Sequence, residues 1–186
     1  MASILNSRTA PLRYSASAKA MHWFVAIAVI TLLMEGPVMK RLVPEGPVKE
    51  NLYLFHEAVG VLVLIVMVAR LARRLTFGVP TPDATMPPVE QRASLWAQYA
   101  LYALLLVVPV LGWAGTNAYG DPVSVFGLFQ FPAILAKDQA LSGRIFVWHL
   151  AGGLVVAAIV ALHVAGALYH GFVKRDRVLR RMLPGV

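Results

Sequence analysis

The sequence predicts an all-α integral membrane protein, a bundle of four transmembrane helices. Hydrophobic residues make up 59% of the 186 positions and charged residues only 14%. This balance leaves too little polar surface to cover a water-soluble domain of this size. Four apolar stretches, at about 21–38, 54–71, 96–115 and 145–169, approach the length that crosses a bilayer, roughly 20 residues. We expect a single transmembrane domain over residues 1–186.

The N-terminal arm, residues 1–19, is rich in Ser and Ala and carries scattered basic residues. It runs directly into the first apolar stretch, and no small-residue cleavage site follows that stretch. A secretory signal peptide would end in such a site. We therefore expect the first stretch to be a retained transmembrane helix.

The three connections between the apolar stretches contain Pro and Gly residues, which are typical of chain outside the hydrocarbon. They include Pro44 and Pro47 in the first connection, Pro80, Pro82, Pro87 and Pro88 in the second, and Gly120, Asp121 and Pro122 in the third. The connections are short, so we expect no second domain between the helices.

Basic residues are distributed unequally among the segments outside the apolar stretches. Twelve Lys and Arg lie in the N-terminal arm, the 70–92 connection and the 174–181 tail, against five in the other two connections. Because cytoplasmic segments of membrane proteins are enriched in Lys and Arg, this asymmetry predicts that both termini are cytoplasmic. It also accounts for the net charge of +8, so we expect membrane lipid and not nucleic acid as the surroundings.

The sequence contains no cysteine. This excludes disulfides, thiolate zinc sites, iron–sulfur clusters and covalently attached c-type haem. It also contains no glycine-rich phosphate loop, nucleophile elbow or dinucleotide fingerprint. Any metal chemistry must therefore use histidine or carboxylate side chains inside the bundle.

All five histidines lie within or at the edge of an apolar stretch: His22, His56, His149, His163 and His170. A single intramembrane histidine is often a polar group bonded to a neighbouring helix, but five indicate a further cause. His149 and His163 are 14 residues apart. This spacing places them within about 40° of the same helix face and roughly 21 Å apart along the axis. It predicts two sites stacked across the membrane.

The histidines of the first two helices can be paired with His149 and His163 by comparing their depths in the membrane. The first helix runs outward, so His22 lies near the cytoplasmic side, and the second runs inward, so His56 lies near the outer side. His56 therefore pairs with His149, and His22 with His163. Each pair offers two axial ligands for the iron of a six-coordinate haem, which favours electron transfer over dioxygen binding. We expect two b-type haems.

Two further groups near the cytoplasmic side have several interpretations. His170 lies about 20° from His163 in helical projection and is a rival ligand opposite His22. It could instead bond a haem propionate, assist proton transfer at a quinone pocket, or be solvated at the interface. The arginines at 70, 73 and 74 could reach propionates by charge-assisted hydrogen bonds, or could simply set the topology.

Glycines near the histidines would leave room for a macrocycle. They are Gly60 after His56, Gly152 and Gly153 after His149, and Gly112 and Gly115 on the third helix. Ordinary helix packing through small residues is the simpler interpretation of these glycines, so they support the haem hypothesis without establishing it.

Several segments spread over nearly the whole chain resemble the bacterial cytochrome b561 family. They are His22-Trp23, His56-Glu57 with Gly60 and Arg70, Trp148-His149, and the stretch from Leu162-His163 through His170 to Leu179-Arg180-Arg181-Met182. The resemblance implies a four-helix bundle in the bacterial inner membrane with two b haems. It also implies that the haem ligands are His22, His56, His149 and His163. These are the same four residues that were paired above by their depth in the membrane.

The resemblance further implies a function, because the family includes stand-alone superoxide oxidases. These take electrons from superoxide at the periplasmic face and pass them to membrane ubiquinone. A quinone pocket on the cytoplasmic side would draw on His170, Lys19, Trp23 and Lys174, each of which could also be an interfacial anchor. For superoxide, the available cations of the outer connections are Lys40, Arg41, Lys49, Lys137 and Arg144.

Two other functions remain open from the sequence. Related b-type subunits anchor hydrogenases and formate dehydrogenases and relay their electrons, in which case the partner is a redox protein. A haem-free scaffold or transporter could use the same histidines for helix packing or proton relay. The direction of electron flow between the two sites is open as well.

Overall fold

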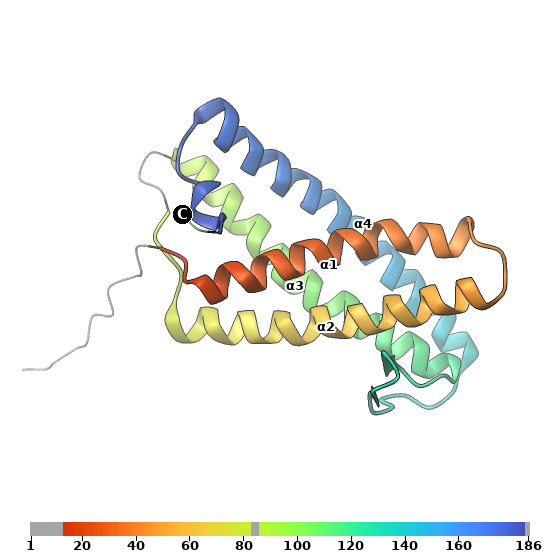
Figure 1. Cartoon of the computed structure of the whole chain (residues 1–186). Helices are drawn as coiled ribbons and strands as arrows, with labels where there is room; N and C mark the ends of the chain where they lie inside the picture. The colour runs from red at the N-terminus through yellow and green to blue at the C-terminus, as the bar shows by residue number, and fades with distance from the viewer. Residues whose placement is uncertain (1–12, 83–85, 185–186) are drawn as a thin grey trace, which may run out of the picture.

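The computed structural model describes residues 13–82 and 86–184. Four long helices dominate it: α1 (Ala16–Arg41), α2 (Pro47–Phe77), α3 (Pro88–Tyr119) and α4 (Gln139–Leu168). Helix α1 packs along α2 and α3 along α4, while α2 also contacts α3 (Figure 1). All four are long and apolar enough to cross a bilayer. The chain is a multi-pass, all-α membrane protein with four candidate spans.

Each helix is longer than the apolar stretch that predicted it, because the signals that start the helices lie outside those stretches. The Ser15 side chain caps α1 by accepting a hydrogen bond from the backbone N–H of Ala18, at 3.2 Å. Asp138 caps α4 in the same way, accepting from Leu141 at 3.0 Å. Helices α2 and α3 both begin with proline, whose φ angle suits the first helical position.

Two glycines end the middle helices. Gly78 follows α2 with a φ of +70°, and Gly120 follows α3 with a φ of +116°. A side chain is unfavourable in this left-handed region, so glycine is the residue that stops a helix there at the least cost.

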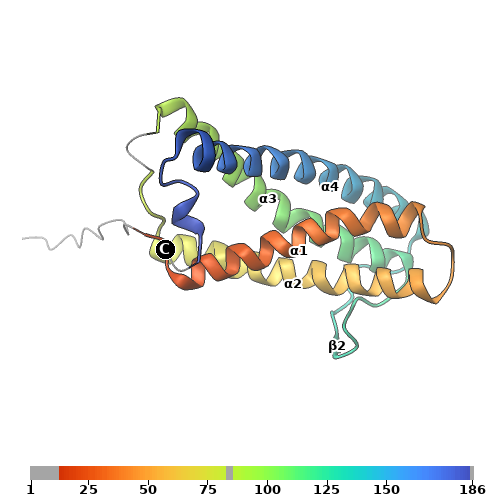
Figure 2. The same cartoon turned by 45° about the horizontal axis from the view of Figure 1, so that its top comes forward.

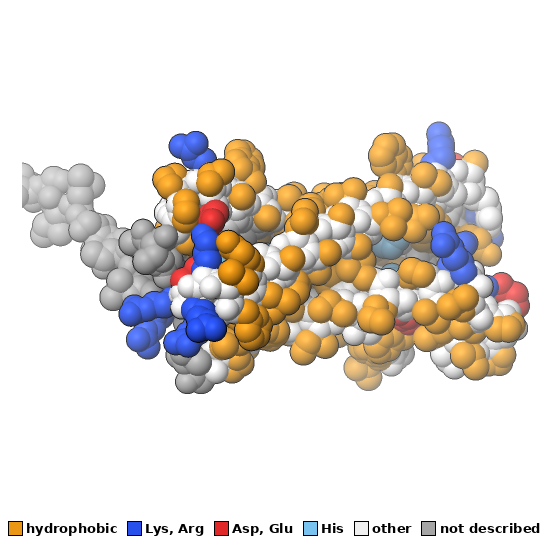
Figure 3. Space-filling model, turned by 90° about the horizontal axis from the view of Figure 1, so that it is seen from above, with side chains coloured by type: hydrophobic (Ala, Val, Ile, Leu, Met, Phe, Trp, Pro, Cys, Tyr) orange, Lys and Arg blue, Asp and Glu red, His pale blue; other side chains and the backbone are white. Residues whose placement is uncertain are grey.

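The two ends of the bundle contain different segments of the chain, which give them their names. The terminal end holds the start of α1 and the C-terminal segment, and the hairpin end holds the connection between α3 and α4 (Figure 2). Hydrophobic side chains cover the long middle of the molecule between them (Figure 3). Lys and Arg gather at both ends of this apolar belt (Figure 3).

The α3–α4 connection contains a short hairpin that was not expected from the sequence. Strands β1 (Ser124–Val125) and β2 (Phe129–Gln130) pair antiparallel, and β1 packs against α2. Val123 and Val125 are buried with Ala58 and Val61 of α2. Strands of two residues are too short to show an alternating pattern, so their formation depends on this tertiary contact.

The chain beyond α4 folds back over the start of α1. Helix α4 continues as a π-helical segment, Tyr169–Lys174, and a 3-10 turn follows at Arg180–Met182. The indole N–H of Trp23 donates to the carbonyl of Met182 at 2.8 Å. The ammonium of Lys19 donates to the carbonyl of Leu183, also at 2.8 Å.

The main core lies in the middle of the bundle. It is formed by buried apolar residues of α1, α2 and α4: Val25, Ala28, Val29, Val59, Val63, Met67 and Val156. Because this cluster lies between the two ends, it separates the polar groups at one end from those at the other.

Candidate functional site

The structure brings four of the five histidines together as two facing pairs. His56 on α2 faces His149 on α4, with ring centroids 6.1 Å apart and ring planes at 72°. His22 on α1 faces His163 on α4, at 6.3 Å and 62°. The first pair is called the hairpin-end pair and the second the terminal-end pair. These are the pairings expected from depth along the helices.

The spacing of both pairs fits one iron between two imidazoles. A metal–imidazole bond is about 2 Å long, and the ring centre lies roughly 1 Å behind the nitrogen. Two imidazoles on opposite sides of one iron therefore have centroids about 6 Å apart. In the described part of the chain, no cluster of three or more His, Cys, Asp or Glu is suited to a bare metal ion. A haem needs only two protein ligands, since its macrocycle supplies four nitrogens.

His149 is oriented by its neighbours on α3 and α4. Its Nδ1 lies 2.9 Å from the backbone carbonyl of Val108, a distance that suits an N–H donated to that oxygen. A Cβ added at Gly112 would lie 3.1 Å from the His149 ring, so the ring occupies the space that a larger residue would fill. With Nδ1 bonded in this way, Nε2 is the ring nitrogen left available to a metal.

His56 has a different environment, because a carboxyl group of α1 faces it. Glu35 Oε2 lies 3.5 Å from His56 Nδ1, and the Glu35 side chain is only 9% exposed. Glu35 was not among the candidate residues selected from the sequence. A carboxylate inside an apolar span is rare, and that signal could have identified it.

At the terminal-end pair, a cation lies beside one of the histidines. Arg70 Nη2 lies 3.5 Å from His22 Nδ1, and the same guanidinium lies over the Tyr102 ring at 5.6 Å. Arg73 bonds Ser15 and Ser17 instead, and Arg74 bonds Gln98. Of the three arginines considered from the sequence, Arg70 is the one brought to a histidine pair.

Basic side chains also surround Tyr14, just before α1. Arg181 lies over the Tyr14 ring at 5.8 Å. Burial raises the pKa of the Tyr14 phenol, an effect opposed by the positive charges of Arg181, Arg74 and Arg70. The terminal end therefore carries a positive field close to the His22/His163 pair.

The glycines near the pairs divide into two groups. A Cβ at Gly112, Gly115 or Gly152 would press on His149, Phe146 or Val108 respectively, so these three allow close packing of α3 and α4. A Cβ at Gly60 or Gly153 would meet nothing within 4 Å. The second group, one turn from His56 and His149, borders open space of the kind that a macrocycle requires. Histidine surface is visible between the helices in the space-filling view (Figure 3).

His170 is buried in a polar network at the terminal end. Its Nδ1 bonds Asp176 Oδ2 at 2.5 Å, and its Nε2 lies 3.6 Å from Glu90 Oε2. Glu90 also accepts from Lys174, at 2.5 and 2.6 Å. His163, not His170, is the histidine whose ring contacts that of His22. Glu90 and Asp176 could not be selected from the sequence, because their proximity to His170 depends on the packing of α3 and on the turn after the π-helical segment.

The two other residues considered for a quinone pocket hold the C-terminal segment. Lys19 and Trp23 donate to the carbonyls of Leu183 and Met182, as described above. Their side chains therefore connect the start of α1 to the tail.

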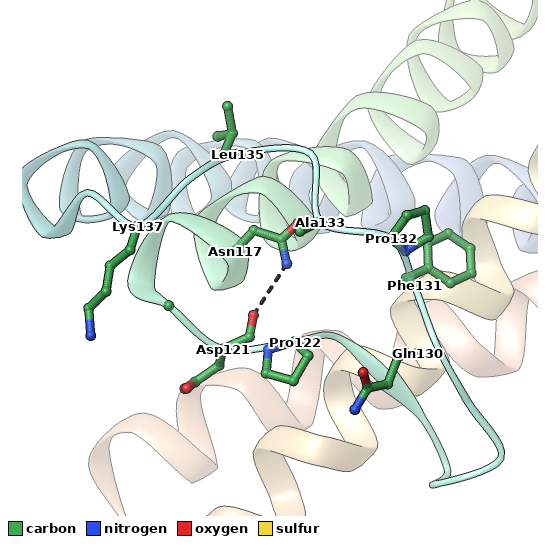
Figure 4. A pocket seen from close by; sticks show the side chains of 10 residues that line it. Asn117, Asp121, Pro122, Gln130, Phe131, Pro132, Ala133, Leu135 and Lys137 are labelled. Carbon is green, nitrogen blue, oxygen red and sulfur yellow. Dashed lines mark hydrogen bonds between the residues drawn. The ribbon is translucent and has the colours of Figure 1, made fainter.

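A cavity of about 500 Å³ lies at the hairpin end, between the end of α3 and the chain leading into α4. Asn117 stands at its wall and bonds the Asp121 carbonyl at 3.2 Å (Figure 4). Phe131 and Lys137 also line it (Figure 4). Lys137, one of the cations predicted to attract an anion, thus lines a cavity that Asp121 also lines.

Together, the four spans and the two facing histidine pairs define a membrane protein of the class that holds haem between helices. Residues 13–185 match the model of the prokaryotic cytochrome b561 family. The chain belongs to this family and is a cytochrome b561-type membrane electron-transfer protein. Membership implies haem b as the cofactor.

Individual relatives match nearly the whole chain. Cytochrome b561 homolog 2 of Escherichia coli K12 is 32% identical over 93% of this chain and 92% of its own length. Cytochrome b562 of Cereibacter sphaeroides is 30% identical over 88% and 90%. A protein of Yersinia pestis named "Probable superoxide oxidase CybB" is 25% identical over 92% and 96%.

Proposed function

We propose that this protein is a di-haem superoxide:ubiquinone oxidoreductase of the bacterial inner membrane. The observation that carries the proposal is the presence of two facing histidine pairs, one toward each end of the bundle, in a member of the cytochrome b561 family. His56 and His149 would hold one haem b, and His22 and His163 the other. When bound, each haem supplies an iron that gains and loses one electron.

The protein residues would set the conditions for this chemistry. The apolar core between the two pairs keeps water away from the path between them. The Val108 carbonyl holds His149 in one tautomer, which keeps Nε2 free for iron. Arg70, beside His22, would contribute a propionate contact by a charge-assisted hydrogen bond.

The proposed reaction is balanced between one donor and one acceptor. Two superoxide anions each lose one electron and become two dioxygen molecules. One ubiquinone takes up both electrons and two protons and becomes ubiquinol. The support for superoxide is the similarity to the Yersinia pestis protein, at 25% identity.

We place superoxide at the hairpin end, where Lys137 borders the cavity described above. Among the other cations of this end, Lys49 contributes less to the attraction of an anion, because its ammonium is paired with Glu45 at 2.5 Å. Superoxide would therefore approach from the Lys137 side.

We place ubiquinone at the terminal end, near His170. A quinone needs proton donors beside its carbonyls, and the network of His170, Asp176, Glu90 and Lys174 provides linked groups that exchange protons. Both termini would be cytoplasmic by the positive-inside rule, so these protons would come from the cytoplasm.

The first experiment is a reduced-minus-oxidised visible spectrum of the detergent-purified protein, with pyridine haemochrome quantification. We expect a b-type spectrum and about two haems per chain. A stopped-flow assay with superoxide and a short-chain ubiquinone should then show superoxide loss coupled to quinol formation.

The same experiment separates the alternatives. Full haem content without superoxide or quinol turnover would overturn the oxidase proposal. It would favour an electron-relay subunit that anchors a dehydrogenase or hydrogenase partner. A colourless protein would contradict the haem proposal and favour a haem-free scaffold or transporter.

A further inference from the structure

The strongest unexplained feature of the structure is a pair of buried polar groups without hydrogen bonds. Within residues 13–82 and 86–184, three buried side-chain atoms lack a hydrogen-bond partner: both carboxyl oxygens of Glu35 and Nδ1 of His56. Leaving a carboxyl group unpaired in an apolar span is energetically unfavourable. Groups that are costly to bury in this way are usually retained for function.

The three atoms belong to one contact between α1 and α2. Glu35 Oε2 lies 3.5 Å from His56 Nδ1, just beyond a well-formed hydrogen bond. The next residue of α1 is Gly36, where an added Cβ would lie 3.8 Å from His56 Cε1. That distance is an ordinary van der Waals contact, so this turn of α1 lies directly beside the imidazole and brings the Glu35 carboxyl group to it.

Comparison with His149, the other histidine of the pair, shows which hydrogen-bond acceptor Glu35 would supply to His56. His149 Nδ1 has the Val108 carbonyl at 2.9 Å, whereas no carbonyl hydrogen-bonds His56 Nδ1. Histidines that bind metals generally donate their second N–H to a carbonyl or a carboxylate, and a carboxylate makes the ligand more basic. Glu35 is the group positioned to do this for His56.

We propose that Glu35 is a positioning residue for His56, accepting a hydrogen bond from its Nδ1–H and lowering the reduction potential of the hairpin-end haem. The inference rests on the proposed function, because it requires haem iron at the His56/His149 pair. The negative charge stabilises the oxidised iron relative to the reduced iron. Arg70 lies beside His22 at the other pair, and a positive charge has the opposite effect there.

These two charges give electron flow a direction. An electron on the hairpin-end haem, close to Glu35, has a higher energy than one on the terminal-end haem, close to Arg70. Transfer from the hairpin end to the terminal end is therefore favourable, and the reverse transfer is not. The sequence alone left this direction open.

The test is a spectroelectrochemical titration of the haem-loaded protein, comparing wild type with Glu35→Gln, Glu35→Asp and Glu35→Leu. We expect Glu35→Gln to raise the potential of the hairpin-end haem by a shift on the order of tenfold in its redox equilibrium, about 59 mV for one electron. The terminal-end haem should keep its potential. Glu35→Asp should retain most of the wild-type value, because it keeps the carboxylate.

Glu57→Gln is the matched control. Glu57 is also a carboxylate of the hairpin end, but its Oε1 accepts from Thr116 at 3.0 Å instead of facing a histidine. A general effect of removing one negative charge would appear in both variants. The proposed contact predicts a clearly larger shift for Glu35→Gln, together with changed EPR g-values of the hairpin-end haem.

The outcomes separate this inference from the proposed function. Wild-type protein without haem would refute the proposed function itself. Two haems in every variant, with the hairpin-end potential unchanged in both Glu35→Gln and Glu35→Leu, would overturn the role of Glu35 alone. If Glu35→Leu loses haem, the Glu35→Gln titration still decides the question.

Discussion

The histidines of this protein illustrate how one side chain can have different roles according to what faces it. His22, His56, His149 and His163 form pairs of rings between helices, whereas His170 lies between two carboxylates at the terminal end. A pair of imidazoles can share one iron. A histidine held by carboxylates is better suited to exchanging protons.

This difference predicts which histidine variants lose haem. Replacing His56 or His149 with Ala should remove the hairpin-end haem, and replacing His22 or His163 should remove the terminal-end haem, because each iron loses an axial ligand. Pyridine haemochrome analysis should show the content falling from two haems to one.

His170→Ala is the control for these variants, since it removes an imidazole outside both pairs. It should keep both haems and slow quinol formation. Retention of haem in His163→Ala together with loss in His170→Ala would show that His170 is the ligand opposite His22.

At the scale of helices, the two halves of the bundle are packed differently. Helices α3 and α4 approach closely through Gly112, Gly115 and Gly152. Where the histidine rings bridge α4 to α1 and α2, Gly60 and Gly153 border open space instead. The same residue type therefore serves close packing on one side and leaves volume for a cofactor on the other.

Gly112→Val tests this packing. The new side chain would meet the His149 ring, which lies 3.1 Å from the position of an added Cβ, and would push it away from His56. We expect selective loss of the hairpin-end haem, measured as a fall to about half of the wild-type haem content.

Gly143→Ala provides the comparison, because a Cβ there meets nothing within 4 Å and alanine favours helix. It should keep both haems and equal or exceed the wild type in thermal stability. Full haem content in Gly112→Val would show that His149 does not need this space.

At the scale of the whole molecule, the unequal distribution of basic residues predicts the orientation of the bundle. Twelve of the 17 Lys and Arg lie in the segments at the terminal end. The membrane insertion machinery retains such segments in the cytoplasm. The hairpin end, with its cavity, would then face the periplasm.

Reporter fusions measure this orientation directly. Green fluorescent protein fused after Val186 should fluoresce, and alkaline phosphatase fused there should be inactive, because both report a cytoplasmic C-terminus. Alkaline phosphatase fused after Gly127, in the hairpin, should be active. The opposite pattern would reverse the assigned sides, and with them the proposed sources of superoxide and protons.

The sequence by itself determined the number of helices, their membrane character and the two histidine pairs. These features depend on local quantities: the length of an apolar stretch, and the 100° rotation per residue that aligns His149 with His163. Family membership was also readable in the order of histidines along the chain.

Only the tertiary structure decided which polar groups accompany each pair. Glu35 meets His56, and Glu90 meets His170, through contacts between different helices, and Asp176 reaches His170 through the turn after the π-helical segment. The β1–β2 hairpin likewise forms where Val123 and Val125 find a buried surface on α2. Such contacts depend on how the helices rotate and approach one another, because packing across the bundle, not the pattern within one helix, selects the neighbours of a side chain.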